Sequence, residues 1–263
     1  MFRIAMRTLT DMPKLAAPTR PPRAPAERRT LAEEVLAVLA LSLLASAVYA
    51  VLSLVEAPLR GVTVAAANQD PRVLRQVLAV VFGLAPVFLV WHLTRRTGEG
   101  PGGIGLALDS PRRDAVEGAI VFAIVGVAGI GIYAAAVTLG VNRFVVPVPP
   151  EGHWWTIPAL LLNAAEAALV EEVIVLGYLV TRLEQLGASS RGAVLGSALL
   201  RGTYHLYQGW GGFAGNLAMG LFFGALFVRR RRTWPFVVAH FLLDVGAGVA
   251  YLTLRDRFPS LFS

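Results

Sequence analysis

The chain has 263 residues, of which 56% are hydrophobic and only 16% are charged, whereas about 25% of residues are charged in a typical soluble domain. It contains no cysteine, its mean hydropathy is +0.61 and its formal net charge is +7. These values exclude an ordinary soluble enzyme, a disulfide-rich secreted module and chemistry based on a cysteine thiolate.

The apolar residues come in runs of about 20, the length that lets a helix cross about 30 Å of hydrocarbon. These runs predict an all-α, polytopic membrane helical bundle of about seven transmembrane helices. The predicted spans are residues 33–55, 73–94, 114–139, 156–184, 191–208, 212–228 and 234–254.

The spans divide the chain into parts of different character. Residues 1–30 are basic and rich in proline, which predicts a disordered cytoplasmic tail. Residues 31–155 hold the three N-terminal spans, residues 156–254 hold the last four, and residues 255–263 form a short outer tail.

The basic residues predict the orientation of the bundle. With the N-terminus in the cytoplasm, seventeen of the 24 Lys and Arg residues lie in cytoplasmic segments, six lie in outer segments, and Arg201 lies inside a span. Cytoplasmic loops of membrane proteins carry such an excess. The pattern therefore predicts an inner N-terminus and an outer C-terminus. It argues against a nucleic-acid partner, because nearly all the arginines lie in loops and in the tail.

Ionisable and polar residues inside the spans gather in the last four helices, and each charge there costs about 2.5–3.5 kcal/mol on insertion. They are Glu166, Glu171 and Glu172 in the fourth span, Arg201, Tyr204, His205 and Tyr207 in the fifth, Asn216 in the sixth, and His240 and Asp244 in the seventh. Carboxylates and imidazoles that converge in lipid suit hydrolysis, since a carboxylate can act as a general base on water and an imidazole can hold a metal or polarise a carbonyl. The alternative is an ion-paired cluster that only fixes helix packing.

Helix geometry relates the members of this set to one another. Glu171 and Glu172 are about 100° apart around an α-helix, so one can face the centre of the bundle while the other meets a neighbouring helix. His240 and Asp244 are four residues apart and share one face.

Three short motifs in this order resemble the CPBP family, which comprises intramembrane CAAX proteases and bacteriocin-processing or self-immunity (ABI) proteins. The usual motifs are EExxxR, FxxxH and HxxxN/D. Here they match as EEVIVL from Glu171 to Leu176, RGTYH from Arg201 to His205, and HFLLD from His240 to Asp244. The resemblance covers about residues 156–254 and looks like a bacterial branch of the family.

The resemblance implies a membrane-embedded endopeptidase with a CAAX-protease-like four-helix catalytic core. Glu171 would then be the general base that activates water, and Glu172 would support it. His205 and His240 would bind a divalent metal, zinc if any, or form the side that stabilises the oxyanion. Asp244 would complete the site. Both the metal-dependent and the metal-free mechanism remain open at this point.

This sequence departs from the family pattern at three positions. Leu176 stands where the first motif has Arg, which removes a guanidinium that could pair with the carboxylates. Arg201 stands where the second motif has an aromatic residue, and we expect it to replace the lost cation from the neighbouring helix, because an unpaired buried charge would be costly. Asp244 in place of Asn adds a negative charge.

The leading hypothesis is an intramembrane (metallo)endopeptidase in the bacterial cytoplasmic (inner) membrane, with the lipid bilayer around it and a membrane-associated peptide or protein as its substrate. The alternative is a catalytically silent scaffold or self-immunity protein with the same fold, which the missing motif Arg favours. A transporter with a proton relay is a third hypothesis, but we find no internal repeat such as many transporters have.

Overall fold

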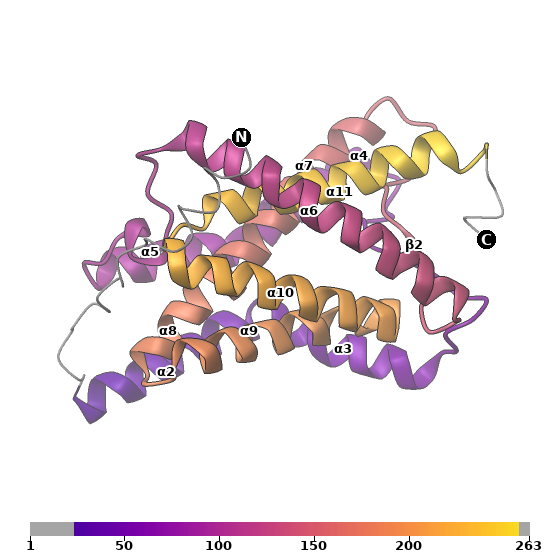
Figure 1. The fold of residues 1–263 in the computed structure, drawn as a ribbon. Helices are drawn as coiled ribbons and strands as arrows, with labels where there is room; N and C mark the ends of the chain where they lie inside the picture. Colours follow the sequence, from indigo (N-terminus) through magenta and orange to yellow (C-terminus); the bar gives the residue numbers. More distant parts are fainter. Residues whose placement is uncertain (1–23, 258–263) are drawn as a thin grey trace, which may run out of the picture.

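A computed structural model describes residues 24–257 of the chain, and these residues are mostly helical (Figure 1). The elements, in chain order, are α2 (Pro25–Ala40), α3 (Leu43–Glu56), β1 (Thr63–Ala65), α4 (Val73–Gly83), α5 (Ala85–Arg96), the short η1 (Pro101–Ile104), α6 (Pro111–Thr138), β2 (Phe144–Val146), α7 (Thr156–Glu171), the π-helical η2 (Glu172–Leu179), α8 (Val180–Gln185), α9 (Ser190–Tyr204), the short η3 (Leu206–Gln208), α10 (Trp210–Arg230) and α11 (Trp234–Leu254). The strands pair in parallel, with Val64 opposite Val145.

Most of the predicted spans are long, apolar helices. In the described part of the chain, four helices are long and apolar enough to cross a membrane: Val73–Arg96, Pro111–Thr138, Trp210–Arg230 and Trp234–Leu254. The pair α2 and α3, bent by 54° at its break, makes a fifth candidate. The prediction of a helical membrane bundle is therefore confirmed.

The predicted fourth and fifth spans differ from these. Residues 156–185 form one path through α7, η2 and α8, and α9 has only 15 residues. At 1.5 Å per residue α9 is about 22 Å long, shorter than the hydrocarbon layer. Helix α9 stops at Tyr204, four residues before the approximate predicted end at residue 208, and His205 occupies its C-cap.

The tail prediction needs one correction. Helix α2 begins at Pro25, so the last residues of the predicted disordered segment 1–30 are helical. Proline suits the first turn of a helix, where its missing N–H would have no partner inside the helix. The rest of that tail, residues 1–23, and the end of the outer tail, residues 258–263, lie outside the described residues.

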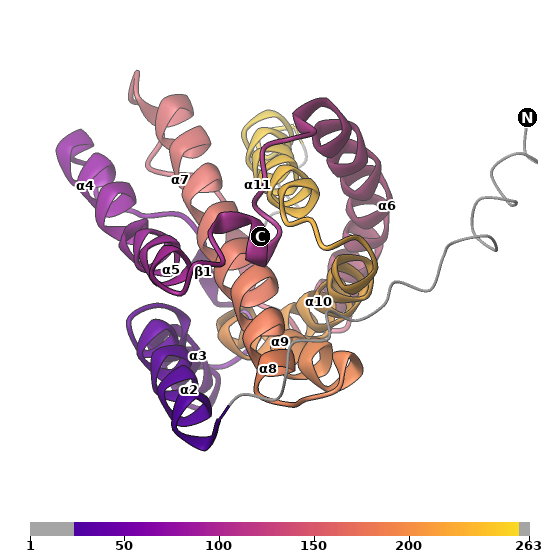
Figure 2. The same ribbon diagram turned by 90° about the vertical axis from the view of Figure 1, so that its left-hand side faces the viewer.

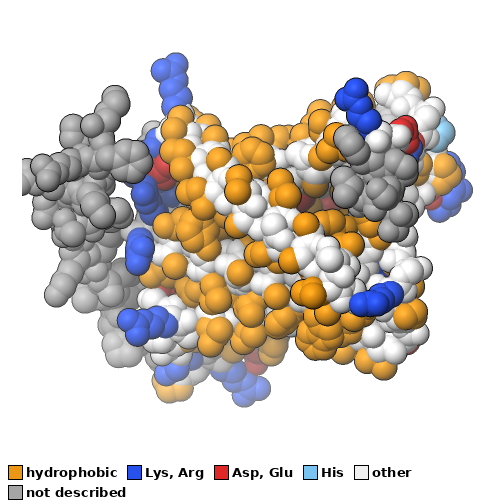
Figure 3. All heavy atoms as spheres, turned by 45° about the vertical axis from the view of Figure 1, so that its right-hand side comes forward, with side chains coloured by type: hydrophobic (Ala, Val, Ile, Leu, Met, Phe, Trp, Pro, Cys, Tyr) orange, Lys and Arg blue, Asp and Glu red, His pale blue; other side chains and the backbone are white. Residues whose placement is uncertain are grey.

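Among residues 24–257, the segments that we expect on the cytoplasmic side lie at one end of the bundle (Figure 1). Ion pairs connect them there: Arg96 with Glu34 at 2.6 Å, Arg182 with Glu99 at 2.5 Å, and Arg231 with Glu184 at 2.5 Å. Figure 3 shows hydrophobic side chains over the face between the two ends and most basic side chains toward the ends. This arrangement suits a protein that crosses the membrane along the long axis of Figure 1.

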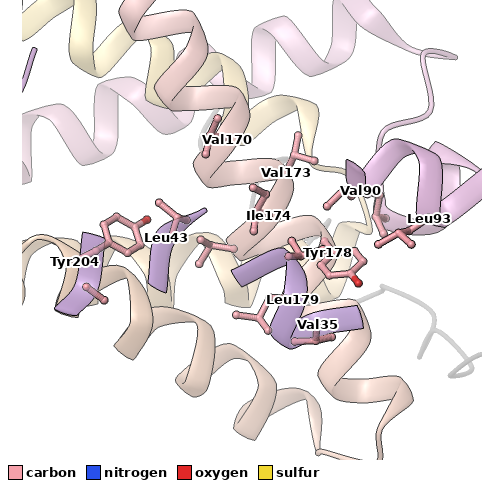
Figure 4. Packing of buried hydrophobic residues seen from close by; sticks show 14 residues of the cluster. Val35, Leu43, Val90, Leu93, Val170, Val173, Ile174, Tyr178, Leu179 and Tyr204 are labelled. Atoms are coloured by element: carbon pink, nitrogen blue, oxygen red, sulfur yellow. The ribbon is translucent and has the colours of Figure 1, made fainter. Parts of the chain in front are cut away.

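The helix that carries the two adjacent glutamates runs through the middle of the bundle (Figure 2). Every residue of η2 is buried. Val173, Ile174, Tyr178 and Leu179 pack against residues of α2, α3 and α5 (Figure 4). Small residues bring α9 and α10 close together, since a Cβ added at Gly220 would lie 3.0 Å from the Cα of Ala198. On the other side of η2, Leu176 belongs to an apolar cluster with Val194 of α9 and Phe236 of α11, so η2 is packed from all of these helices.

Candidate active site

The polar residues predicted for the site meet where α7 continues into η2. Glu171 is the last residue of α7 and Glu172 is the first residue of the π-helical segment. Such π-helical segments are rare and occur frequently at functional sites. The two carboxylates share one neighbour, because the guanidinium of Arg201 on α9 lies within 4 Å of both.

Glu172 is the buried member of the pair, with an exposed fraction of 0%. Its Oε1 accepts a hydrogen bond from Nη2 of Arg201 and lies 2.8 Å from Nδ1 of His240. Within residues 24–257 its Oε2 has no hydrogen-bond partner. A buried charge is tolerated when it is paired, and Glu172 has a partner on each of two neighbouring helices.

Glu171 has a different environment. Its Oε2 accepts a hydrogen bond of 2.7 Å from the hydroxyl of Tyr204, and Nη1 of Arg201 lies 3.8 Å away. The side chain is 14% exposed, compared with 0% for Glu172. Glu171 is therefore the carboxylate that water can reach.

His205 lies at the C-terminal end of α9, and its ring contacts both the helix and the turn that follows it. Nδ1 is 3.0 Å from the backbone oxygen of Arg201, one turn earlier. Because a carbonyl oxygen can only accept, Nδ1 carries the proton and Nε2 of the neutral ring offers a lone pair. The rings of Tyr204 and Tyr207 flank the imidazole at centroid distances of 4.7 and 6.2 Å.

His240 and Asp244 lie on the same face of α11, as their spacing predicts. Nε2 of His240 is 3.5 Å from Oδ2 of Asp244, too long for a good hydrogen bond. The Asp244 side chain is 40% exposed and that of His240 only 7%. The site is therefore closed around Glu172 and open on the side of Asp244.

Arg201 lies where the expected replacement cation should be. It is 1% exposed, and its guanidinium also lies over the ring of Phe223 on α10, 5.7 Å from the centroid. Leu176, in the motif position usually held by Arg, is 3% exposed and belongs to an apolar cluster with Val180 and Phe223. The cation is thus supplied from α9, while the side chain of Leu176 packs among hydrophobic residues.

The donor set, as arranged, does not resemble a zinc site, which takes three or four ligands. Among the described residues, no group of three or more His, Cys, Asp or Glu side chains is placed to hold a metal ion. One nitrogen of His240 faces Glu172 and the other faces Asp244. The prediction of zinc at His205 and His240 stays a prediction, and the chemistry proposed below uses no metal.

Sequence reasoning named Tyr204 as a polar residue but assigned it no role. The structure places its hydroxyl directly on Glu171, and its side chain is nearly fully buried. Helical spacing was the available signal, because Arg201, Tyr204 and His205 lie at positions i, i+3 and i+4 and share one face of α9.

Comparison with known proteins gives a match to the part of the chain that holds the site. Residues 153–246 match the family model described as "Type II CAAX prenyl endopeptidase Rce1-like". No curated protein and no solved structure matches the chain. The matched segment contains all of the site residues described above, and it supports the resemblance to the CAAX-protease family for the last four helices.

Proposed function

We propose that the chain is an intramembrane endopeptidase in which Glu171 activates water. The observation that carries this proposal is the unequal environment of two adjacent carboxylates. Glu172 is fully buried and paired with two cation-forming side chains, whereas Glu171 is partly exposed, accepts a hydrogen bond from the Tyr204 hydroxyl and lies 3.8 Å from Arg201. A general base must reach its water molecule, and of the two glutamates Glu171 has that access.

The reaction needs one water molecule. Glu171 takes a proton from the water while the water oxygen attacks the carbonyl carbon of the peptide. The C–N bond then breaks, and the leaving nitrogen takes the proton from Glu171, which restores the carboxylate. His240 lies between two carboxylate oxygens, so it acts as an imidazolium that donates from Nδ1 to Glu172. Its Nε2–H faces Asp244 on the open side of the site, where it can donate to the developing oxyanion once substrate displaces that weak contact.

The other polar groups of the site hold Glu171 and His240 in place. Glu172 orients His240 through Nδ1, and Arg201 balances the negative charge of the glutamate pair. Nε2 of His205 offers a lone pair that can orient the attacking water. Removal of one partner from such a buried network leaves another buried charge less completely paired.

The proposed substrate is the end of a membrane-associated peptide or protein, in agreement with the name of the matched family. The proposed location is a bacterial inner membrane with a cytoplasmic N-terminus, and the excess of Lys and Arg in the segments expected on the cytoplasmic side supports this orientation. Protease protection of an N-terminal tag in oriented vesicles tests that orientation.

The test of the activity is cleavage in reconstituted vesicles. Wild type, Glu171→Gln and Glu33→Gln are incubated with prenylated peptides ending in a CAAX sequence and with unprenylated membrane peptides. Glu33 is an exposed residue of α2 that pairs with Arg29, so we expect Glu33→Gln to cleave like wild type and Glu171→Gln to lose cleavage at least 100-fold.

Metal analysis and chelation accompany the assay. Full cleavage after chelation, with no metal bound, agrees with the proposed reaction; loss of cleavage with metal bound supports the zinc prediction instead. If wild type and Glu171→Gln both fail to cleave any peptide, the scaffold or immunity hypothesis replaces the protease.

A further inference from the structure

An arginine outside the matched segment is tied to the turn that follows His205. Arg143 lies in the loop between α6 and β2 and is only 1% exposed. Its guanidinium makes five hydrogen bonds, and every acceptor is a backbone or hydroxyl oxygen. They are to Ser53 O (2.6 Å), Ser53 Oγ (2.7 Å), Ala57 O (2.7 Å), Pro58 O (3.2 Å) and Tyr207 O (2.8 Å).

Most of these acceptors lie at the C-terminal end of α3. The last carbonyl groups of a helix have no partner inside the helix, and the helix dipole makes them attractive to a cation. The planar guanidinium, with five N–H groups, can serve several of them at once. One side of Arg143 is therefore anchored on α3.

The loop that contains Arg143 also binds the turn between α9 and α10, which begins at His205. Besides the bond from the guanidinium to Tyr207 O, the backbone N–H of Arg143 donates to the oxygen of Gln208 at 2.6 Å. Asn142 pairs with Gly209 in an antiparallel bridge, and its side-chain oxygen accepts from the N–H of Gly212 at 2.8 Å.

This turn has little freedom around Gly209, whose φ is +108° and where an added Cβ would lie 2.6 Å from the oxygen of Val141. The backbone from residue 207 to residue 212 is thus held at several points by residues 141–143. His205 lies two residues before this held segment. Its ring stacks against that of Tyr207, whose backbone oxygen accepts from Arg143.

We propose that Arg143 is a positioning residue for His205. It fixes the turn between α9 and α10 against the end of α3, and so determines where the imidazole stands relative to Glu171. This proposal rests on the proposed function for its effect on activity. It also means that the first three spans, which precede the matched segment, complete the site rather than only anchor it.

The first arm of the test is kinetic. Arg143→Met should lower kcat/KM per folded molecule about 10- to 100-fold, with most of the loss in kcat, because a displacement of about 1 Å in a catalytic group costs about 100-fold. Arg143→Lys should recover part of the loss, since Lys keeps the charge but cannot serve all five oxygens. The matched control is Arg60→Met: Arg60 lies in the neighbouring outer loop, is exposed and donates to Leu139 O, and we expect its loss to change nothing.

The second arm does not depend on activity. Because the chain has no cysteine, His205→Cys creates a single thiol, which a water-soluble maleimide can label. Its labelling rate should rise several-fold when Arg143→Met is added and remain unchanged when Arg60→Met is added.

The two arms separate the proposals. If wild type cleaves nothing while Arg143→Met still changes the labelling rate, the positioning role stands and the protease proposal fails. If wild type cleaves, and Arg143→Met matches it per folded molecule and in labelling rate, the positioning role is wrong.

Discussion

Removal of the Arg201 guanidinium should both destabilise the protein and inactivate it. Arg201 and Glu172 are 1% and 0% exposed, and Arg201→Met would leave Glu172 with His240 as its remaining charged partner. Loss of one partner from a buried ion pair costs about 3–5 kcal/mol. At about 2–4 °C per kcal/mol for a chain of 150–250 residues, this corresponds to about 6–20 °C in melting temperature.

The assay is thermal unfolding in detergent, followed by the fluorescence of the five tryptophans, together with cleavage per folded molecule. Glu172→Leu combined with Arg201→Met should recover part of the lost stability, because the double change removes both buried charges. It should not recover cleavage, because His240 loses the carboxylate that orients it.

Arg182→Met is the matched control. Arg182 is also 0% exposed and pairs with Glu99 at 2.5 Å, but it lies at the end of the bundle and outside the site. We expect a similar loss in melting temperature with kcat unchanged per folded molecule. The reasoning about charge replacement is refuted if Arg201→Met melts within about 2 °C of wild type and cleaves at the wild-type rate.

Three further outcomes are expected. Tyr204→Phe removes one hydrogen bond to Glu171, so it should lower kcat about 10-fold while the free energy of unfolding changes by only about 1 kcal/mol. An unchanged kcat would mean that the hydroxyl does not position the base. Gly220→Val should destabilise the packing of α9 against α10 by about 1–3 kcal/mol. Gly129→Val should have no effect, because among the described residues nothing lies within 4 Å of an added Cβ there. Equal melting temperatures of the two variants would contradict this packing. The pKa of Asp70 is lowered to about 2 by hydrogen bonds from Arg72. The ionised Asp70 carboxylate therefore stabilises the fold at any pH above its ordinary pKa of 3.8, and this stabilisation is lost only as the pH falls toward 2. Asp70→Asn should leave the acid limb of the pH–activity profile unchanged. A shifted limb would mean that Asp70 titrates in the pH range of activity.

Much of the architecture could be predicted because a bilayer imposes strong local rules. Apolar runs of the right length identified the helices, and basic residues grouped the loops that lie together at one end. Ionisable residues are costly in lipid, so Glu171, Glu172, Arg201, His205 and His240 stood out as the candidate site without any knowledge of their contacts. Each of these inferences uses only a residue and its neighbours in sequence.

Tertiary structure decided how these groups are paired and which of them is accessible. Arg201 and His240 meet Glu172 from 29 and 68 residues away, and Arg143 meets Ser53 from 90 residues away. The π-helical turn after Glu171 also depends on the helices packed around it. Local patterns identify which side chains are unusual in a membrane, but the folded arrangement of distant helices makes one carboxylate a buried partner and leaves its neighbour open to water.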